Sequence, residues 1–279
     1  MGKQVLITAI ATLGGFVFGS DVGLVSKIQT YQTFIDFFKL SNAQLGLMVA
    51  ALLLGCMMGS LGSSYLAESY GRKKSIIIGS IVFTAGIFTQ LSAMAGFTIL
   101  VLGRYFTGLA VGILSSVVPM YLSEVCDPDK RGMLVSCQQL AITIGILVSY
   151  LVAMACEGVS VFGLSDWQTA ISLQLIPAAL MFFGMLTLPA SPRWLLSKRL
   201  YEEAKKALSN LRGKTFKNVE NEYYELKSEA EMEIEQLGWS EAFKQYGNRI
   251  LIGIFVQMFQ QISGINGLMV NITNLVLFY

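Results

Sequence analysis

Long apolar stretches constrain the fold of this chain more than any other feature. A helix needs about 20 apolar residues to cross a bilayer core, and the chain contains seven stretches of about this length. They cover residues 5–25, 43–66, 75–95, 97–118, 133–155, 167–188 and 250–278. Only 14% of all residues are charged, against about 25% in ordinary soluble domains. The sequence therefore predicts an all-α, multi-pass membrane protein.

The residue types that most enzymes depend on are scarce. The chain has no histidine, and its four cysteines show neither the spacing of metal ligands nor that of a disulfide framework. Sites built on imidazole, such as Ser-His triads, are therefore excluded. We expect Asp21 and Glu124 on opposite sides of the membrane, where they cannot act together. The sequence predicts no enzyme activity, no metal and no cofactor.

Basic residues gather in alternate loops. Arg72, Lys73 and Lys74 follow the second apolar stretch, Lys130 and Arg131 follow the fourth, and eleven more lie between residues 193 and 249. Cytoplasmic loops carry an excess of Lys and Arg. These loops are therefore expected in the cytoplasm together with the amino terminus. The plasma membrane is the expected location.

The composition divides the chain into three parts. Residues 1–188 are expected to form a six-helix bundle, and residues 250–279 a seventh membrane helix. The charged segment 189–249 between them is predicted to form amphipathic helices on the cytoplasmic surface. One apolar face would contain Ala204, Ala207, Leu208 and Leu211, and another Leu226, Ala230 and Leu237. A solvated linker is the alternative, because residues 220–235 are very acidic. This layout is expected of a transporter built from six-helix halves.

Asp21 and Arg104 are two ionisable residues well inside apolar stretches. At 1.5 Å per residue, Asp21 lies about 24 Å from the inner end of its helix and Arg104 about 10 Å from the outer end of its own. Both depths fall in the outer third of a core about 30 Å thick, so the two residues are candidate partners. Asp21 either binds and releases a proton under the influence of Arg104, or forms a permanent ion pair with it.

Two pairs of glycines, Gly55 with Gly59 and Gly108 with Gly112, are spaced four residues apart. This spacing lets helix backbones approach closely. We interpret these pairs as packing contacts.

Amides and a hydroxyl are set into the apolar stretches. Gln138 and Gln139 lie in the fifth, and the seventh contains Gln260, Gln261, Ser263 and Asn266. The latter four spread over more than half of a regular helix, so Gly264 and Gly267 suggest local unwinding that lets them converge. Amides satisfy the hydroxyls of a neutral sugar or polyol. Interhelical hydrogen bonds are the alternative.

Short motifs follow one another along the chain. They are GFVFGSDVG at 15–23, GRKK at 71–74, GR at 103–104, VPMYLSE at 118–124 with KRG at 130–132, QL at 139–140, Trp167 with Gln174 and Pro177, PASPRWL at 189–195, and QQISGIN at 260–266. In this order they resemble the sugar porter family of the major facilitator superfamily, whose members transport hexoses and polyols. The resemblance implies the amino-terminal half of that fold, the cytoplasmic helical linker and part of helix 7.

The resemblance also implies roles for individual residues. Gln139, Gln260, Gln261 and Asn266 match positions that hydrogen-bond the sugar, and Ile142 and Ile146 match apolar positions of the same cavity. The residues that match the cytoplasmic gate, a charge cluster that latches the two halves, are Arg72, Lys73, Glu124, Arg131 and Arg193. Asp21 matches a position where proton-coupled members carry an acid, and Arg104 is its candidate partner.

Several residues depart from the family pattern. Ser20 stands for an aromatic residue, Glu68 for Asp, Gln168 for Arg and Ala190 for Glu, while Val270 and Asn271 replace a pair of tyrosines of the outer gate. Substrate identity, latch strength and gate closure depend on these positions.

The resemblance implies transport of a hexose or related polyol by alternating access, as a facilitator or a proton symporter. The chain is expected to be a fragment that ends in helix 7 and is inactive without the missing carboxy-terminal half. The alternative is a non-transporting sugar sensor, or a divergent or interrupted transporter-like protein. The expected partners are a small neutral sugar or polyol, a proton and the lipid bilayer, and no nucleic acid.

Overall fold

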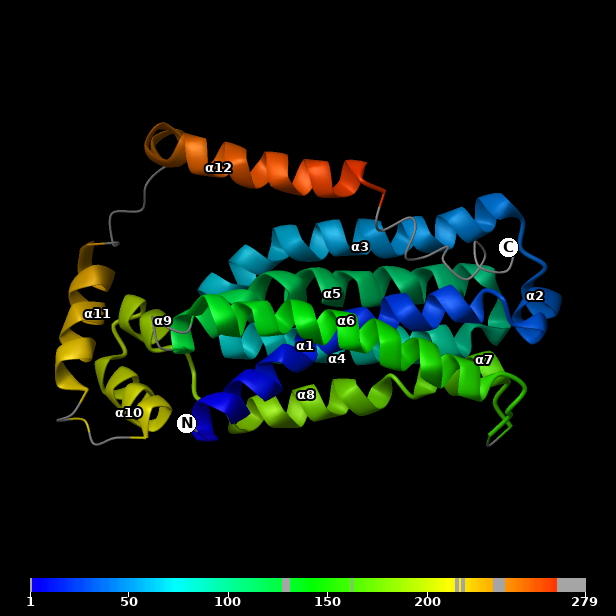
Figure 1. Cartoon of the computed structure of the whole chain (residues 1–279), viewed down its shortest axis with the longest axis horizontal. Coiled ribbons are helices and arrows are strands. Elements are labelled where there is room, and N and C mark those ends of the chain that lie inside the picture. The colour runs from blue at the N-terminus through cyan, green and yellow to red at the C-terminus, as the bar shows by residue number, and fades with distance from the viewer. Residues whose placement is uncertain are drawn as a thin grey trace.

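The protein is a bundle of long helices (Figure 1). The computed structural model describes residues 2–126, 131–161, 163–213, 216, 219–232 and 239–264. The bundle helices are α1 (Gly2–Ile28), α3 (Asn42–Ser69), α4 (Arg72–Leu91), α5 (Phe97–Val125), α6 (Arg131–Cys156), α7 (Asp166–Ser172) and α8 (Leu175–Thr187). Within the described residues, six helical segments are long and apolar enough to cross a membrane. The first six predicted spans are thus confirmed.

The sixth span consists of two helices rather than one. A turn at Leu173 and Gln174 separates α7 from α8. Pro177 explains the break, because proline has no N–H to donate to the carbonyl four residues earlier, which is that of Leu173. The Leu173 carbonyl instead accepts a 3.2 Å hydrogen bond from the Ile176 N–H. The break places the Gln174 side chain at the bend.

A short helix that was not predicted, α2 (Gln32–Phe38), lies at the end of the bundle where α7 begins (Figure 1). The rings of Phe34 and Phe38 pack against Trp167, with centroids 5.9 and 5.5 Å away. The Tyr31 hydroxyl, just before α2, donates to the carbonyl of Ala153 in α6. Burial raises the pKa of the Tyr31 phenol, which keeps this donor protonated. These contacts tie the loop between α1 and α3 to α6 and α7.

Glycines bring the backbones of neighbouring helices together. A Cβ atom at Gly59 of α3 would lie 2.1 Å from the Leu109 carbonyl oxygen of α5, and one at Gly108 would lie 2.2 Å from that of Leu52. The same contact joins α1 to α6, where a Cβ at Gly19 would lie 2.0 Å from the Ile142 carbonyl oxygen. The predicted close approach at the glycine pairs is confirmed.

Three short helices form a second unit at one end of the bundle: α9 (Pro192–Ser197), α10 (Tyr201–Arg212) and α11 (Glu220–Met232) (Figure 1). The predicted apolar face of α10 is confirmed, since all four of its residues are buried. Ala230 of α11 joins their core, and Leu226 packs against it. Leu237 lies outside the described residues.

The last described helix, α12 (Trp239–Ile262), runs through residue 250, where we placed the boundary between linker and seventh span. The three-part division of the chain remains a prediction. The structure describes the seventh span only as far as Gly264. The helix ends at Ile262, and Gly264, two residues later, has a φ of 71°; the expected unwinding that would let the polar residues converge remains a prediction. Gly267 lies outside the described residues.

Candidate functional site

The centre of the bundle contains an ion pair between α1 and α5. Arg104 Nη1 lies 2.7 Å from Asp21 Oδ1, and the two side chains are only 3% and 1% exposed. The depth estimate from the sequence thus matched two residues that do meet. Both charges are shielded from water, so neither can replace its partner with solvent. The stability of such a pair therefore depends on the geometry of the contact between the two groups.

The pair is not fully saturated with hydrogen bonds. Among the described residues, neither Asp21 Oδ2 nor Arg104 Nε has a hydrogen-bond partner. The Arg104 carbonyl accepts a 3.1 Å bond from the Thr107 hydroxyl, which in turn accepts from Gln90 at 3.4 Å. A single hydrogen bond therefore joins the two charges, and each has one buried atom left to bond a proton, water or ligand.

The α6 part of the predicted sugar site lies beside α1. Ile142 and Ile146 are half-buried because their backbones face Gly19 and Gly23 of α1, whereas Gln139 is exposed. Its neighbour Gln138 is 6% exposed and packs against Gly15. Of the two adjacent amides, Gln139 is thus the one whose side chain is accessible to a ligand.

The α12 part of the predicted site is exposed. Gln260 and Gln261 lie on a regular helix whose side chains from Leu251 to Gly264 are all exposed, and Figure 1 draws α12 at the edge of the bundle next to α3 in this view. Asn266 lies outside the described residues. The described structure does not pack these amides against Gln139, and their joint role remains a prediction.

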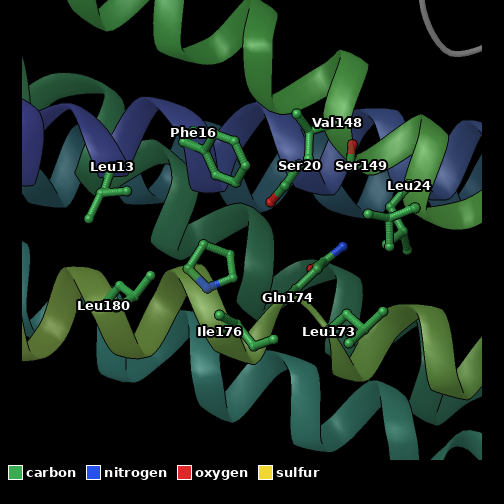
Figure 2. A pocket seen from close by; sticks show the side chains of 12 residues that line it. Leu13, Phe16, Ser20, Leu24, Val148, Ser149, Leu173, Gln174, Ile176 and Leu180 are labelled. Atoms are coloured by element: carbon green, nitrogen blue, oxygen red, sulfur yellow. The ribbon is translucent and has the colours of Figure 1, made fainter.

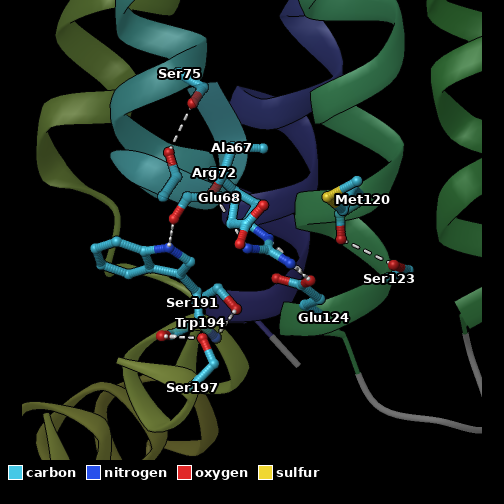
Figure 3. A network of polar contacts seen from close by, with 11 residues as sticks. Ala67, Glu68, Arg72, Ser75, Met120, Ser123, Glu124, Ser191, Trp194 and Ser197 are labelled. Carbon is cyan, nitrogen blue, oxygen red and sulfur yellow. Dashed lines mark hydrogen bonds and ion pairs between the residues drawn. The ribbon is translucent and has the colours of Figure 1, made fainter. Parts of the chain in front are cut away.

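The predicted cytoplasmic gate contains one close charge pair. Arg72 at the start of α4 contacts Glu124 near the end of α5 through Nε and Nη2, at 2.9 and 2.7 Å (Figure 3). Arg72 also donates to the Ala67 carbonyl at 3.2 Å. Lys73 instead donates to the Leu186 carbonyl near the end of α8, at 2.9 Å. The two neighbouring cations therefore anchor different helices.

The other gate residues connect to the α9–α11 unit. Arg193 of α9 pairs with Glu229 of α11. The side chain of Arg131 lies outside the described residues, although α6 begins at this position. Sequence reasoning missed a further pair, in which Arg212 Nη2 contacts Glu222 at 2.5 Å while Nη1 donates to the Val125 carbonyl at 3.2 Å. Its signal in the sequence was a cation at the end of one amphipathic helix and an acid at the start of the next.

Trp194 joins the α9–α11 unit to the bundle. Its ring N–H donates to the Glu68 carbonyl at 2.9 Å, as Figure 3 shows. Gly71 allows this approach, because a Cβ there would lie 2.9 Å from the Trp194 ring and its φ is 84°. Glu68 thus contributes its backbone to this contact, which does not depend on the change from Asp. Gln168, which stands where the family pattern has Arg, caps its own helix and donates to the Leu91 carbonyl at 2.9 Å.

The chain belongs to the sugar transporter family, because the family model described as "Sugar (and other) transporter" matches residues 7–276. It is similar to the galactose-proton symporter of Escherichia coli, with 34% identity over 93% of this chain and 54% of the relative. It is also similar to a high glucose sensor of Saccharomyces cerevisiae, with 35% identity over 94% of this chain and 36% of the relative.

A solved structure shows the same fold. The proton:xylose symporter XylE of Escherichia coli, bound to 6-bromo-6-deoxy-D-glucose, superimposes with a TM-score of 0.83 at 28% identity, over 96% of this chain and 61% of that one. The predicted major facilitator fold is therefore confirmed, as is the prediction of a multi-pass membrane protein that is not an enzyme. The chain spans about half the length of the galactose-proton symporter that it matches.

Proposed function

We propose that this chain forms the amino-terminal part of a sugar transporter that works by alternating access. The observation that carries the proposal is membership of the sugar transporter family across residues 7–276. The accessible Gln139 amide beside half-buried Ile142 and Ile146 supports a neutral, hydroxyl-rich substrate such as a hexose. We place the protein in the plasma membrane with its amino terminus in the cytoplasm.

Proton coupling is the finer part of the proposal. Asp21 is buried and has one unpartnered oxygen, and the galactose and xylose relatives are named as proton symporters. Protonation of Asp21 would weaken its attraction to Arg104, which lets the pair open during the transport cycle. A facilitator with a permanent pair remains the competing mechanism.

The test is uptake of labelled hexoses by the full-length protein in proteoliposomes, with and without a proton gradient. We expect Gln139→Ala to raise the apparent KM for sugar, and Gln138→Ala to leave it unchanged, since Gln138 is buried against α1. Asp21→Asn should abolish gradient-driven accumulation but leave exchange of sugar across the membrane. Accumulation in Asp21→Asn equal to that of the parent would refute the proton mechanism.

A sugar sensor is the second candidate, favoured by the similarity to the yeast high glucose sensor. A sensor would bind hexose with the same Gln139 dependence and show no stereospecific flux. Equilibrium binding and flux measured on one preparation separate the two functions. We expect residues 1–279 alone to give no flux in either case, because alternating access needs a second half to move against.

A further inference from the structure

A cavity of about 350 Å³ lies between α1, α6 and the α7–α8 segment (Figure 2). Its α6 wall contains Val148, Ser149 and Val152. On a helix that turns about 100° per residue, Val148 lies about 180° around α6 from Gln139. Val148 is therefore on the opposite side of α6 from Gln139, whereas Ser149 lies about 20° from Ile142, one of the apolar residues predicted to line the sugar site.

The cavity wall is apolar and its rim faces the expected lipid. On α1 the lining residues form a single stripe of Leu13, Phe16, Ser20 and Leu24. Across from them, Ile176 and Leu180 of α8 also line the cavity and are each 58% exposed. Both lie in a membrane-length segment, so their exposed surface would contact acyl chains. A ligand would thus enter from the bilayer rather than from water.

Gln174 brings an unsatisfied amide into this apolar space. Its side chain is 3% exposed, and its Oε1 atom has no hydrogen-bond partner within the described part of the chain. Figure 2 shows it pointing from the α7–α8 bend across the cavity toward the wall that carries Ser20 and Ser149. Those two hydroxyls donate to carbonyls of their own helices, at 2.8 and 3.1 Å. The carboxamide is therefore left to a ligand, since a buried polar group without a partner is unfavourable.

We propose that this crevice binds a neutral, membrane-dissolved alcohol, that is, a long apolar body with a single hydroxyl group. The hydroxyl would exchange hydrogen bonds with the Gln174 carboxamide, because each group both donates and accepts. The apolar body would lie along the α1 stripe. No charged residue lines the cavity, so an ionic headgroup has no partner there. A sugar is also excluded, because most of its hydroxyls would stay unsatisfied.

The size and depth of the crevice agree with this ligand. Its volume falls at the lower end of the range of about 300–1,000 Å³ for small-molecule pockets. Gln174 lies eight residues after Asp166, or about 12 Å below the outer end of the span. A molecule with one hydroxyl reaches this depth at lower cost than a phospholipid headgroup does.

The test is photolabelling of the intact protein in phosphatidylcholine nanodiscs. The probe is 1-hexadecanol with a diazirine in its chain and a terminal alkyne, and the matched probe is the same molecule without the hydroxyl. We expect the alcohol to label peptides that contain residues 13–24, 148–152 and 173–180. Competition with unlabelled 1-hexadecanol then gives an apparent affinity.

Two variants and one control separate a specific site from general lipid contact. Gln174→Leu should weaken binding of the alcohol about 2- to 12-fold, the effect of one hydrogen bond, and leave alkane labelling unchanged. Gln138→Leu removes another buried amide whose oxygen has no partner within the described chain but which does not line the cavity, and should leave binding of the alcohol unchanged. Ser20→Phe should fill the crevice and abolish labelling by both probes. Equal labelling by the two probes, or equal effects of the two glutamine variants, would overturn the proposal.

Discussion

Two arginine–carboxylate pairs in this protein have the same shortest distance and very different surroundings. Arg104–Asp21 inside the bundle and Arg72–Glu124 at the end of the bundle beside α9 both have a closest N–O distance of 2.7 Å. The first pair is 3% and 1% exposed, and the second is 19% and 10% exposed. Removing one partner of the Arg104–Asp21 pair leaves the other charge unpaired in a region of low dielectric constant. Removing one partner of the Arg72–Glu124 pair leaves the other charge within reach of water. The cost of breaking each pair, in free energy of unfolding, should therefore depend on its burial rather than on its N–O distance.

The largest expected effect is that of breaking the buried pair. Arg104→Leu leaves the Asp21 carboxylate without compensation, at a cost of about 3–5 kcal/mol in the free energy of unfolding. Unfolding of the purified protein by a denaturing detergent measures this change. The double variant Asp21→Leu with Arg104→Leu should regain most of the loss, because no charge then remains buried. A double variant as unstable as Arg104→Leu would contradict this explanation.

Breaking the Arg72–Glu124 pair at the end of the bundle should cost less. Glu124→Ala removes a charged hydrogen bond and a second close ion-pair contact from Arg72, and we expect a loss of about 1.5–3 kcal/mol. Water can reach the freed guanidinium, which limits the cost. The control is Glu203→Ala at an exposed position of α10, with an expected change within about 0.5 kcal/mol. If Glu124→Ala cost as much as Arg104→Leu in the same unfolding assay, burial would not explain the ranking.

Close backbone contact inside the bundle provides the next test, and it involves no charge. Gly59→Ala places a methyl group where a Cβ would lie 2.1 Å from the Leu109 carbonyl oxygen, so α3 and α5 must separate. We expect a loss of about 1–3 kcal/mol, as for other overpacked sites. Gly62→Ala on the same helix meets nothing within 4 Å and is the matched control. Equal melting temperatures of the two variants would show that α3 and α5 adjust freely.

The features that could be predicted from the sequence are mostly those determined by residues close together in the chain. Apolar length located the six spans, and the spacing of Ala204, Ala207, Leu208 and Leu211 predicted the buried face of α10. Depth arithmetic matched Asp21 with Arg104, because a charge in hydrocarbon needs a partner at its own level.

Features that depend on contacts between distant segments were not predicted. The helix α2 is held by the Trp167 ring and by the bond from the Tyr31 hydroxyl to the Ala153 carbonyl, and both Trp167 and Ala153 lie far from α2 in the sequence. The pairing of Arg212 with Glu222 requires knowing how α10 and α11 fold back on each other. Gln174 was noticed only as part of a family motif, since its burial without a partner appears only once α8 is placed against α1.

The smallest expected effect belongs to a more exposed arginine–carboxylate pair, Arg193 with Glu229, whose side chains are 38% and 53% exposed. A double-mutant cycle with Arg193→Gln and Glu229→Gln should give a coupling energy of about 0.2–1 kcal/mol. Raising the salt concentration from about 0.1 to 1 M shortens the screening length from about 10 to 3 Å and should remove most of this coupling. The Asp21–Arg104 coupling should keep its value, because ions do not enter the bundle. A salt-insensitive Arg193–Glu229 coupling would mean that this pair is shielded from water in solution. Side-chain exposure would then not predict the strength of this pair.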